Sequence, residues 1–166
     1  MLNNCHKSIP KSNSTRILSQ SDTQFMMLDR ITEIHSDGLT GIKQFSHALP
    51  YLAIESCAQL GAFHIRYRVG FCRHIFLGKV KHFDLWPTNQ LHGIFTITGT
   101  CVSESSDAYL YKIQFADHMR STDGNFLFGA ADYDVRFDEK RLKQHYHDMF
   151  ERLWADQSYI SSSLNE

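Results

Sequence analysis

The chain has 166 residues and a formal net charge of −1; 42% of its residues are hydrophobic and 21% are charged. This is the size and composition of one globular domain, and the balanced charge gives no electrostatic case for a nucleic-acid or anionic-membrane partner. A membrane span needs roughly 20 consecutive apolar residues, and no run in the sequence approaches that length.

The first 21 residues are rich in Ser, Asn and Lys, and we expect residues 1–21 to form a flexible extension. They contain no apolar core segment, so we expect no signal peptide. The cysteines lie far apart without a CxxC pair, which favours reduced thiols and a cytoplasmic location. They are Cys5, Cys57, Cys72 and Cys101.

The folded domain is expected to occupy residues 22–137 and to open with a β-hairpin. An apolar run begins at residue 25, and Asp37-Gly38 lies between two segments of strand-like composition. Asp-Gly in that position is a strong hairpin signal. Ile31 and Ile34 break the strict alternation of the first strand, which predicts a β-bulge within it.

A helix is predicted to follow, beginning at Pro50 and ending near Gly70. Residues 49–63 read LPYLAIESCAQLGAF and are apolar nearly all the way round, as in a buried helix. The segment carries one carboxylate, Glu55, which costs several kcal/mol in a buried position unless it is paired, protonated or functional. Gly61 would allow another backbone to approach the helix closely.

The polar residues at the end of this helix, Arg66, Tyr67 and Arg68, are expected to emerge toward solvent.

After this helix the apolar pattern changes to a period of two, which predicts strands. Strands are expected over residues 74–86, 90–104, 108–117 and 126–137, and turns at 87–89, 105–107 and 121–125. Strands joined by such short turns form antiparallel sheets.

Residues 138–155 are predicted to form an amphipathic helix that covers a surface of the domain, and residues 156–166 a frayed tail. One face of this helix carries Leu142, Tyr146, Met149, Phe150 and Leu153. The expected fold is of the α+β class: an antiparallel sheet wrapped around one long central helix, which is the hotdog fold, plus a C-terminal helix.

The order of motifs over residues 16–137 resembles the 3-hydroxyacyl-[acyl-carrier-protein] dehydratases. An apolar run ends in Asp29-Arg30, the helix carries Glu55 followed by Ala58-Gln59, and Pro87 and Gln90 keep part of that family's Pro-Gly-Asp-Gln turn. The family's Gly-His-Phe-Pro sequence and its longer proline-rich loop are replaced here by Phe-Ser-His-Ala-Leu-Pro at residues 45–50. The chain is therefore closest to a variant branch, similar to the dehydratase-like proteins of aryl-polyene clusters, in which some members look like partner subunits.

The resemblance implies two catalytic residues, His47 as the base and Glu55 as the acid, contributed by different subunits of a dimer. Backbone N–H groups near Tyr51 and Leu52 would bind the substrate's carbonyl oxygen. Gln59 shares a helix face with Glu55 and could orient its carboxylate or lie at a dimer seam.

The residues themselves also allow plainer interpretations, in which Glu55 faces water and His47 is a surface loop histidine. Metal binding by His74, His82 and His92 is not expected, because their spacing matches no ligand motif.

The favoured function is dehydration of a 3-hydroxyacyl thioester to a trans-2-enoyl thioester. The substrate would be carried on the pantetheine of acyl carrier protein or of coenzyme A, and no further cofactor is expected. The alternatives are an acyl thioesterase and a non-catalytic partner subunit of an active paralogue. We therefore expect a homodimer, or a heterodimer with a hotdog paralogue.

A basic stretch could dock the acidic carrier protein, or could simply be a solvated face. It comprises Arg66, Arg68, Arg73, Lys79 and Lys81.

Overall fold

A computed structural model describes residues 26–134 and 138–155, so the expectations for residues 1–21 and 156–166 lie outside the described residues. The described elements, in chain order, are β1 (Arg30–Ile34), β2 (Gly38–Ala48), α2 (Leu52–Arg68), β3 (His74–Lys81), β4 (Leu91–Glu104), β5 (Ala108–Ala116), β6 (Ser121–Ala131) and α3 (Glu139–Ala155).

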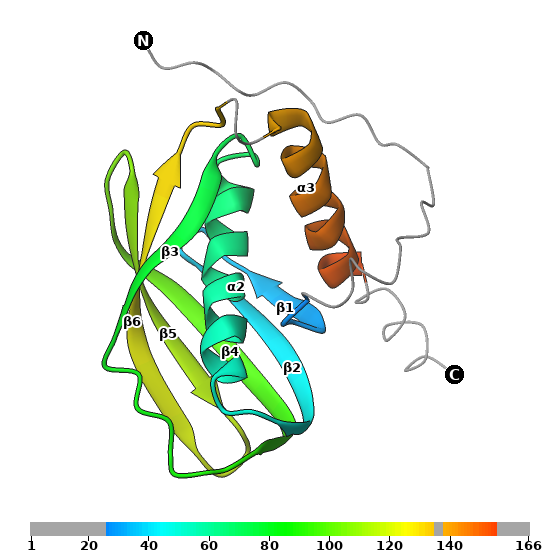
Figure 1. Ribbon diagram of the computed structural model, residues 1–166, viewed down its shortest axis with the longest axis vertical. Helices are drawn as coiled ribbons and strands as arrows, with labels where there is room; N and C mark the ends of the chain where they lie inside the picture. Colours follow the sequence, from blue (N-terminus) through cyan, green and yellow to red (C-terminus); the bar gives the residue numbers. More distant parts are fainter. Residues whose placement is uncertain (1–25, 135–137, 156–166) are drawn as a thin grey trace.

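The strands form one antiparallel sheet in the order β1-β2-β4-β5-β6-β3, and the sheet curves around α2 (Figure 1). The hairpin of β1 and β2 is confirmed, and so is its bulge, which falls between Ile31 and Glu33. Helix α2 begins two residues after Pro50 and ends two before Gly70, whose φ of 62° is the left-handed conformation that glycine adopts easily. The expected arrangement of sheet and central helix is therefore observed.

Helix α2 is apolar on all sides because different partners cover it on different sides. Toward the sheet, a Cβ atom on Gly61 would lie 2.6 Å from the Phe128 ring. The close approach predicted at this glycine is therefore made by a side chain and not by another backbone. Leu60 fits against Gly41 and Gly99, where added Cβ atoms would lie 3.1 and 2.8 Å from its methyl groups.

Helix α3 packs beside the C-terminal half of α2 and contacts β1 (Figure 1). The predicted apolar face is confirmed, since Met149, Phe150 and Leu153 are buried. The Phe150 ring stacks on Tyr67 at 5.1 Å and meets Phe71 edge-on at 5.7 Å.

The end of α2 differs from expectation at Arg66, which is buried with 6% of its surface exposed. Its guanidinium donates to the Ile75 carbonyl at 2.8 Å and lies 3.8 Å from the centre of the Tyr146 ring. A cation can be buried against an aromatic face because the ring carries negative charge there. The contact with Tyr146 depends on α3, which lies 80 residues further along the chain.

The strand boundaries differ from expectation in three places. The turn between β5 and β6 is at residues 117–120, where the Asp117 carboxylate accepts the N–H groups of Met119 and Arg120 at 2.7 Å each. The turn predicted at residues 121–125 is wrong, because that segment belongs to β6 and Gly124 gives room to Phe83.

The second difference concerns the strand predicted over residues 74–86. Strand β3 ends at Lys81, and the following residue, His82, has a φ of 58°. The third difference concerns the strand predicted over residues 126–137, because β6 ends at Ala131 and the next described residues, 132–134, are not in a strand.

None of the described helices is long and apolar enough to cross a membrane. Within the described residues Cys57, Cys72 and Cys101 are free thiols, and Cys57 is buried in the core. Cys5 lies outside the described residues.

Candidate functional site

The connection from β2 to α2 holds the predicted histidine. The register between β2 and β4 shifts between Phe45 and Ala48, so a bulge interrupts the ladder there. His47 lies within it with a φ of 57°, a conformation that non-glycine residues adopt at a cost of about 1–3 kcal/mol. Bulges re-aim side chains, and this one presents the His47 ring at the surface.

Two neighbours hold the imidazole of His47. Its Nδ1 atom is 3.0 Å from Oε1 of Gln90, the residue just before β4. The ring centre of His92 is 5.0 Å away, with the two ring planes tilted by 39°. The histidine is therefore exposed but oriented.

Glu55 lies in the first turn of α2, one short connection away from His47 along the chain. The sequence pattern favoured a buried carboxylate, but the side chain is exposed in the single chain. Water can reach it, and so can a substrate or a second copy of the chain.

The N–H groups at the start of α2 are partly occupied. Leu52 N–H donates to the Leu49 carbonyl and Ala53 N–H to the Pro50 carbonyl, both at 3.1 Å. Proline has no N–H, so among residues 50–53 the Tyr51 N–H is the one without a hydrogen-bond partner in the described part of the chain. The Tyr51 side chain is 58% exposed beside an exposed Leu49, which gives this end of the molecule an apolar surface.

Gln59 connects α2 to the segment that precedes β1. Its amide oxygen accepts the Met27 N–H at 2.9 Å. That contact anchors the chain before β1 and does not involve Glu55. The role predicted for Gln59 at the carboxylate stays a prediction.

The prediction that the five basic residues form one exposed surface is wrong, because the three arginines among them are engaged within the fold. Arg66 is buried, Arg68 pairs with Glu104 at 2.6 Å, and Arg73 pairs with Asp107 at 2.7 Å. The two lysines, Lys79 and Lys81, stay exposed on β3.

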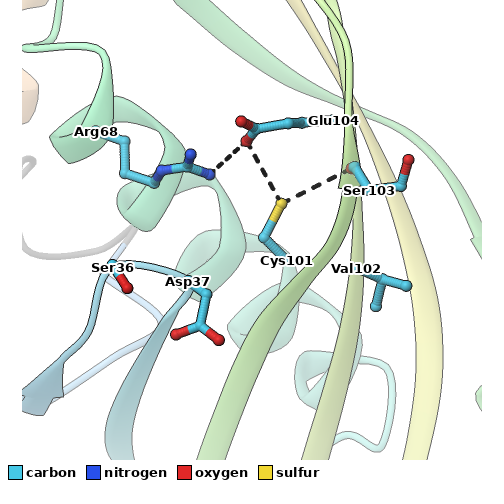
Figure 2. Close-up of a pocket in the computed structure, with 7 residues that line it drawn as sticks. All are labelled: Ser36, Asp37, Arg68, Cys101, Val102, Ser103 and Glu104. Atoms are coloured by element: carbon cyan, nitrogen blue, oxygen red, sulfur yellow. Dashed lines mark hydrogen bonds and ion pairs between the residues drawn. The ribbon is translucent and has the colours of Figure 1, made fainter.

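A cleft lies at the C-terminal end of α2, away from His47 and Glu55 (Figure 2). Its lining is Ser36, Asp37, Arg68, Cys101, Val102, Ser103 and Glu104. The Arg68 guanidinium lowers the pKa of the Glu104 carboxyl by direct hydrogen bonding. Burial raises the pKa of the Cys101 thiol, which is the opposite of what a nucleophilic cysteine needs. The cleft therefore carries a structural ion pair and no activated nucleophile.

Beneath this cleft is a buried polar pair that sequence reasoning missed, His64 and Tyr111. Nε2 of His64 donates to the His35 carbonyl at 3.0 Å, so Nδ1 is left to accept the Tyr111 hydroxyl at 2.6 Å. The pair connects α2 to the β1–β2 turn and to β5. The only sign of this pair in the sequence was His64, a single histidine in an otherwise apolar stretch of the helix. A histidine in such a stretch is equally compatible with an exposed position.

In the part of the chain that the structure describes, no three His, Cys, Asp or Glu side chains come together in a group that could hold a metal ion.

The sequence matches no family model and no curated protein. The fold is shared with solved structures. The ApeI:P dehydratase heterocomplex from Xenorhabdus doucetiae superposes with a TM-score of 0.55 at 11% identity, over 68% of this chain and 86% of that chain. A mutant thioesterase from Pseudomonas aeruginosa gives 0.53 at 11% identity, over 63% and 81%.

A hypothetical thioesterase from Streptococcus pneumoniae, solved with coenzyme A, gives a TM-score of 0.54 at 10% identity, over 69% of this chain and 98% of that chain. Together with the sheet order and the central helix, these likenesses identify the fold. The chain is a hotdog-fold protein of the α+β class, as the sequence predicted.

Proposed function

We propose that this protein acts on acyl thioesters as a 3-hydroxyacyl dehydratase of the hotdog fold, with His47 and Glu55 as its catalytic pair. One observation carries the proposal: an oriented histidine and an exposed carboxylate lie at the two ends of the β2–α2 connection. Solved structures of this fold include a dehydratase heterocomplex and thioesterases, which supports thioester chemistry as the general class.

In this proposal Nε2 of His47 removes the α-proton of the 3-hydroxyacyl thioester. The thioester oxygen gains charge, and the Tyr51 N–H at the start of α2 stabilises it. Glu55 donates a proton to the departing 3-hydroxyl group, which leaves as water. The product is a trans-2-enoyl thioester. His47 then loses its extra proton to solvent and Glu55 takes one up, so both side chains return to their starting protonation states.

The proposed active unit is a dimer in which His47 of one copy faces Glu55 of the second copy. The exposed apolar side chains of Leu49 and Tyr51 flank Glu55, and exposed apolar surface at a site is typical of a contact with substrate or with another chain. Acyl carrier protein is the proposed donor of substrate, and Lys79 and Lys81 are the cations left to contact its acidic surface.

A thioesterase is the second candidate, and the exposure of Glu55 is the observation in its favour. A carboxylate that activates water as a general base must be reachable by water, and Glu55 is. Such an enzyme would break the thioester bond and release a free thiol, whereas a dehydratase leaves that bond intact.

A non-catalytic partner subunit is the third candidate. The chain lacks the glycine before the histidine and the long proline-rich loop of the dehydratases it resembles. A dehydratase of this fold occurs as a heterocomplex in Xenorhabdus doucetiae. In that case the isolated chain would be inactive and would bind an active paralogue.

The test is Glu55→Gln in the full chain, assayed on 3-hydroxyacyl thioesters of several chain lengths. The amide fills the same space but cannot donate an acidic proton, so we expect enoyl formation to fall by about 10²–10⁴-fold. Glu139→Gln is the matched control, because Glu139 is also an exposed glutamate in the first turn of a helix. It should leave turnover unchanged.

Two readouts separate the candidates. Enoyl absorbance without thiol release supports the dehydratase, and thiol release that depends on Glu55 supports the thioesterase. A wild-type chain that does neither, but co-purifies with a hotdog paralogue, supports the partner subunit. Wild-type turnover in Glu55→Gln would remove Glu55 from the mechanism.

A further inference from the structure

Among the described residues, Gln90 is the hydrogen-bond partner of the His47 side chain, and its own position is fixed. The Thr88 hydroxyl donates to the Gln90 carbonyl at 2.7 Å and accepts the Gln90 N–H at 3.3 Å. This local turn holds the backbone of Gln90 where β4 begins. The side chain then reaches 43 residues back along the sequence to the His47 ring.

The chemistry of this contact selects one tautomer of His47. An amide oxygen is only an acceptor, so Nδ1 of His47 must carry the hydrogen in the 3.0 Å contact with Oε1 of Gln90. In the neutral ring Nε2 is then unprotonated and holds a lone pair. A general base needs its lone pair on the nitrogen that faces the substrate.

Two further features restrict the ring. The bulge at residues 46–47 and the left-handed φ of His47 set the direction of its Cβ atom, and the His92 ring lies against one side of the imidazole at 5.0 Å. Backbone strain of this kind persists only where the surrounding structure enforces it. The ring is therefore constrained by the bulge, by His92 and by Gln90.

We infer that Gln90 is a positioning residue for His47, which holds the imidazole as the Nδ1–H tautomer and so leaves Nε2 as the base. The catalytic part of this inference rests on the proposed function. The tautomer itself is a property of the folded chain and can be measured without any substrate.

The first test is nitrogen-15 NMR of the full chain near neutral pH, with the His47 signals assigned by comparison with His47→Ala. We expect the protonated nitrogen of His47 to be Nδ1 in the wild type. In Gln90→Leu this preference should be lost in favour of the Nε2–H form or a mixture. A matched control is Gln114→Leu, because Gln114 is an exposed glutamine on β5. An Nε2–H ring in the wild type, or an unchanged Nδ1–H ring in Gln90→Leu, overturns the inference.

The second test is kinetic. Loss of the hydrogen-bond partner of a metal-ligating histidine typically costs about 10–100-fold, and by analogy Gln90→Leu should lower kcat by a similar factor with little change in KM. Gln90→Glu restores an acceptor for Nδ1–H and should recover part of kcat. Its negative charge favours the imidazolium, so the acid limb of the kcat/KM profile should move to higher pH. A variant that was merely destabilised would show neither the rescue nor the displaced limb.

The two proposals fail separately. If wild-type protein has no thioester activity, the proposed function fails, and NMR still decides the tautomer. If Glu55→Gln abolishes activity while Gln90→Leu keeps the wild-type kcat, the proposed function stands and the positioning role is overturned. Should Gln90→Leu not fold, Thr88→Val is the substitute, because it removes the turn that holds Gln90 and is expected to shift the same tautomer balance.

Discussion

Burial separates two kinds of polar residue along α2. Glu55 is exposed at the first turn, while His64 and Arg66 are buried near the last turns with partners from other elements. A buried polar group without a partner would cost free energy, so these two residues stabilise the fold only while their partners stay in place. Glu55 makes no such buried contact with the described residues, so its substitution tests function with little effect on stability.

His64 predicts how stability depends on pH. Burial lowers the pKa of His64 below its ordinary value of 6.5 in the unfolded chain, with a smaller effect in the same direction from Arg68. The hydrogen bond to the His35 carbonyl opposes this lowering of the pKa most strongly, and the carboxylates of Asp37 and Glu104 oppose it to a smaller extent. As the pH falls below about 6.5, His64 therefore binds a proton in the unfolded chain but stays neutral in the folded chain.

We therefore expect the contribution of neutral His64 to be fully present above about pH 6.5 and to be lost as the pH falls toward the lower folded pKa. The melting temperature, followed by circular dichroism from pH 7.5 to 4.5, should fall on the acid side. His64→Gln should make that slope shallower even if its melting temperature is lower throughout. His118→Gln, which changes an exposed histidine in the turn before β6, should leave the slope as it is. Equal slopes in wild type and His64→Gln would contradict this account.

At the scale of single residues, the sequence identified those that stand out from their immediate neighbours along the chain. Glu55 was found because a carboxylate stands out in an apolar helix. Its expected burial is not observed, because none of the described residues covers its side chain at the first turn of α2. Arg66 and His64 were missed because their partners, Tyr146 and Tyr111, come from distant elements. Sequence spacing along one helix carries no information about such contacts.

At the scale of elements, the contact between α2 and the sheet depends on glycines that admit large side chains. Phe128 and Ile113 fill the space beside Gly61, at 2.6 and 3.2 Å from where a Cβ atom would lie. Alanine favours a helix over glycine by about 1 kcal/mol, so helix propensity and packing oppose each other at this position.

We expect packing to decide, because Phe128 is fully buried and cannot move freely. Gly61→Ala should reduce the free energy of unfolding by about 1–3 kcal/mol, as overpacked cores do. Gly78→Ala is the control, since Gly78 lies on the exposed edge strand β3 and the nearest atom to its added Cβ would be the Leu127 carbonyl oxygen, at 3.4 Å. Chemical denaturation measures both. A Gly61→Ala protein as stable as wild type would mean that the helix can move away from the sheet at no cost.

The elements predicted correctly are those whose signals are local. Asp-Gly fixed the first hairpin, and the period of α3 showed its buried face. The turn at residues 121–125 was misplaced because Gly124 looks like a turn glycine in the sequence. In the fold it is a strand glycine that admits Phe83, and Asp117 supplies the real turn. A contact between segments about 40 residues apart decided this case, and local propensity could not show it.

At the scale of the whole molecule, the two edges of the sheet are not equivalent. Helix α3 contacts β1 at one edge, whereas β3 at the other edge pairs only with β6 among the described residues. Phe76 and Leu77 on β3 are 47% and 40% exposed. An unpaired apolar edge strand is a template for pairing with another chain, so we propose that two copies join through β3 into a continuous sheet.

We expect light scattering at micromolar concentration to give twice the chain mass of 19.2 kDa. Phe76→Lys with Leu77→Lys should shift the protein to the monomer, because edge lysines block strand pairing. Val102→Lys is the control, since Val102 is exposed on β4 in the middle of the sheet. A wild-type monomer that stays a monomer when a hotdog paralogue is added would contradict dimerisation through this edge.

In the proposed dimer the two proposed catalytic groups of each site come from different chains, and mixing two inactive variants tests this. His47→Ala and Glu55→Gln should each be inactive as homodimers, since each removes one member of every proposed site. In a mixed dimer, a site shared between subunits pairs the intact His47 of one chain with the intact Glu55 of the other, so one of its two sites is complete. Random exchange of equal amounts makes half of the dimers mixed, so about a quarter of wild-type activity should return. If both groups act within one chain, every site keeps one defect and mixing restores nothing. Recovery that is abolished by the paired lysine substitutions on β3 would link the catalytic pair to this sheet edge.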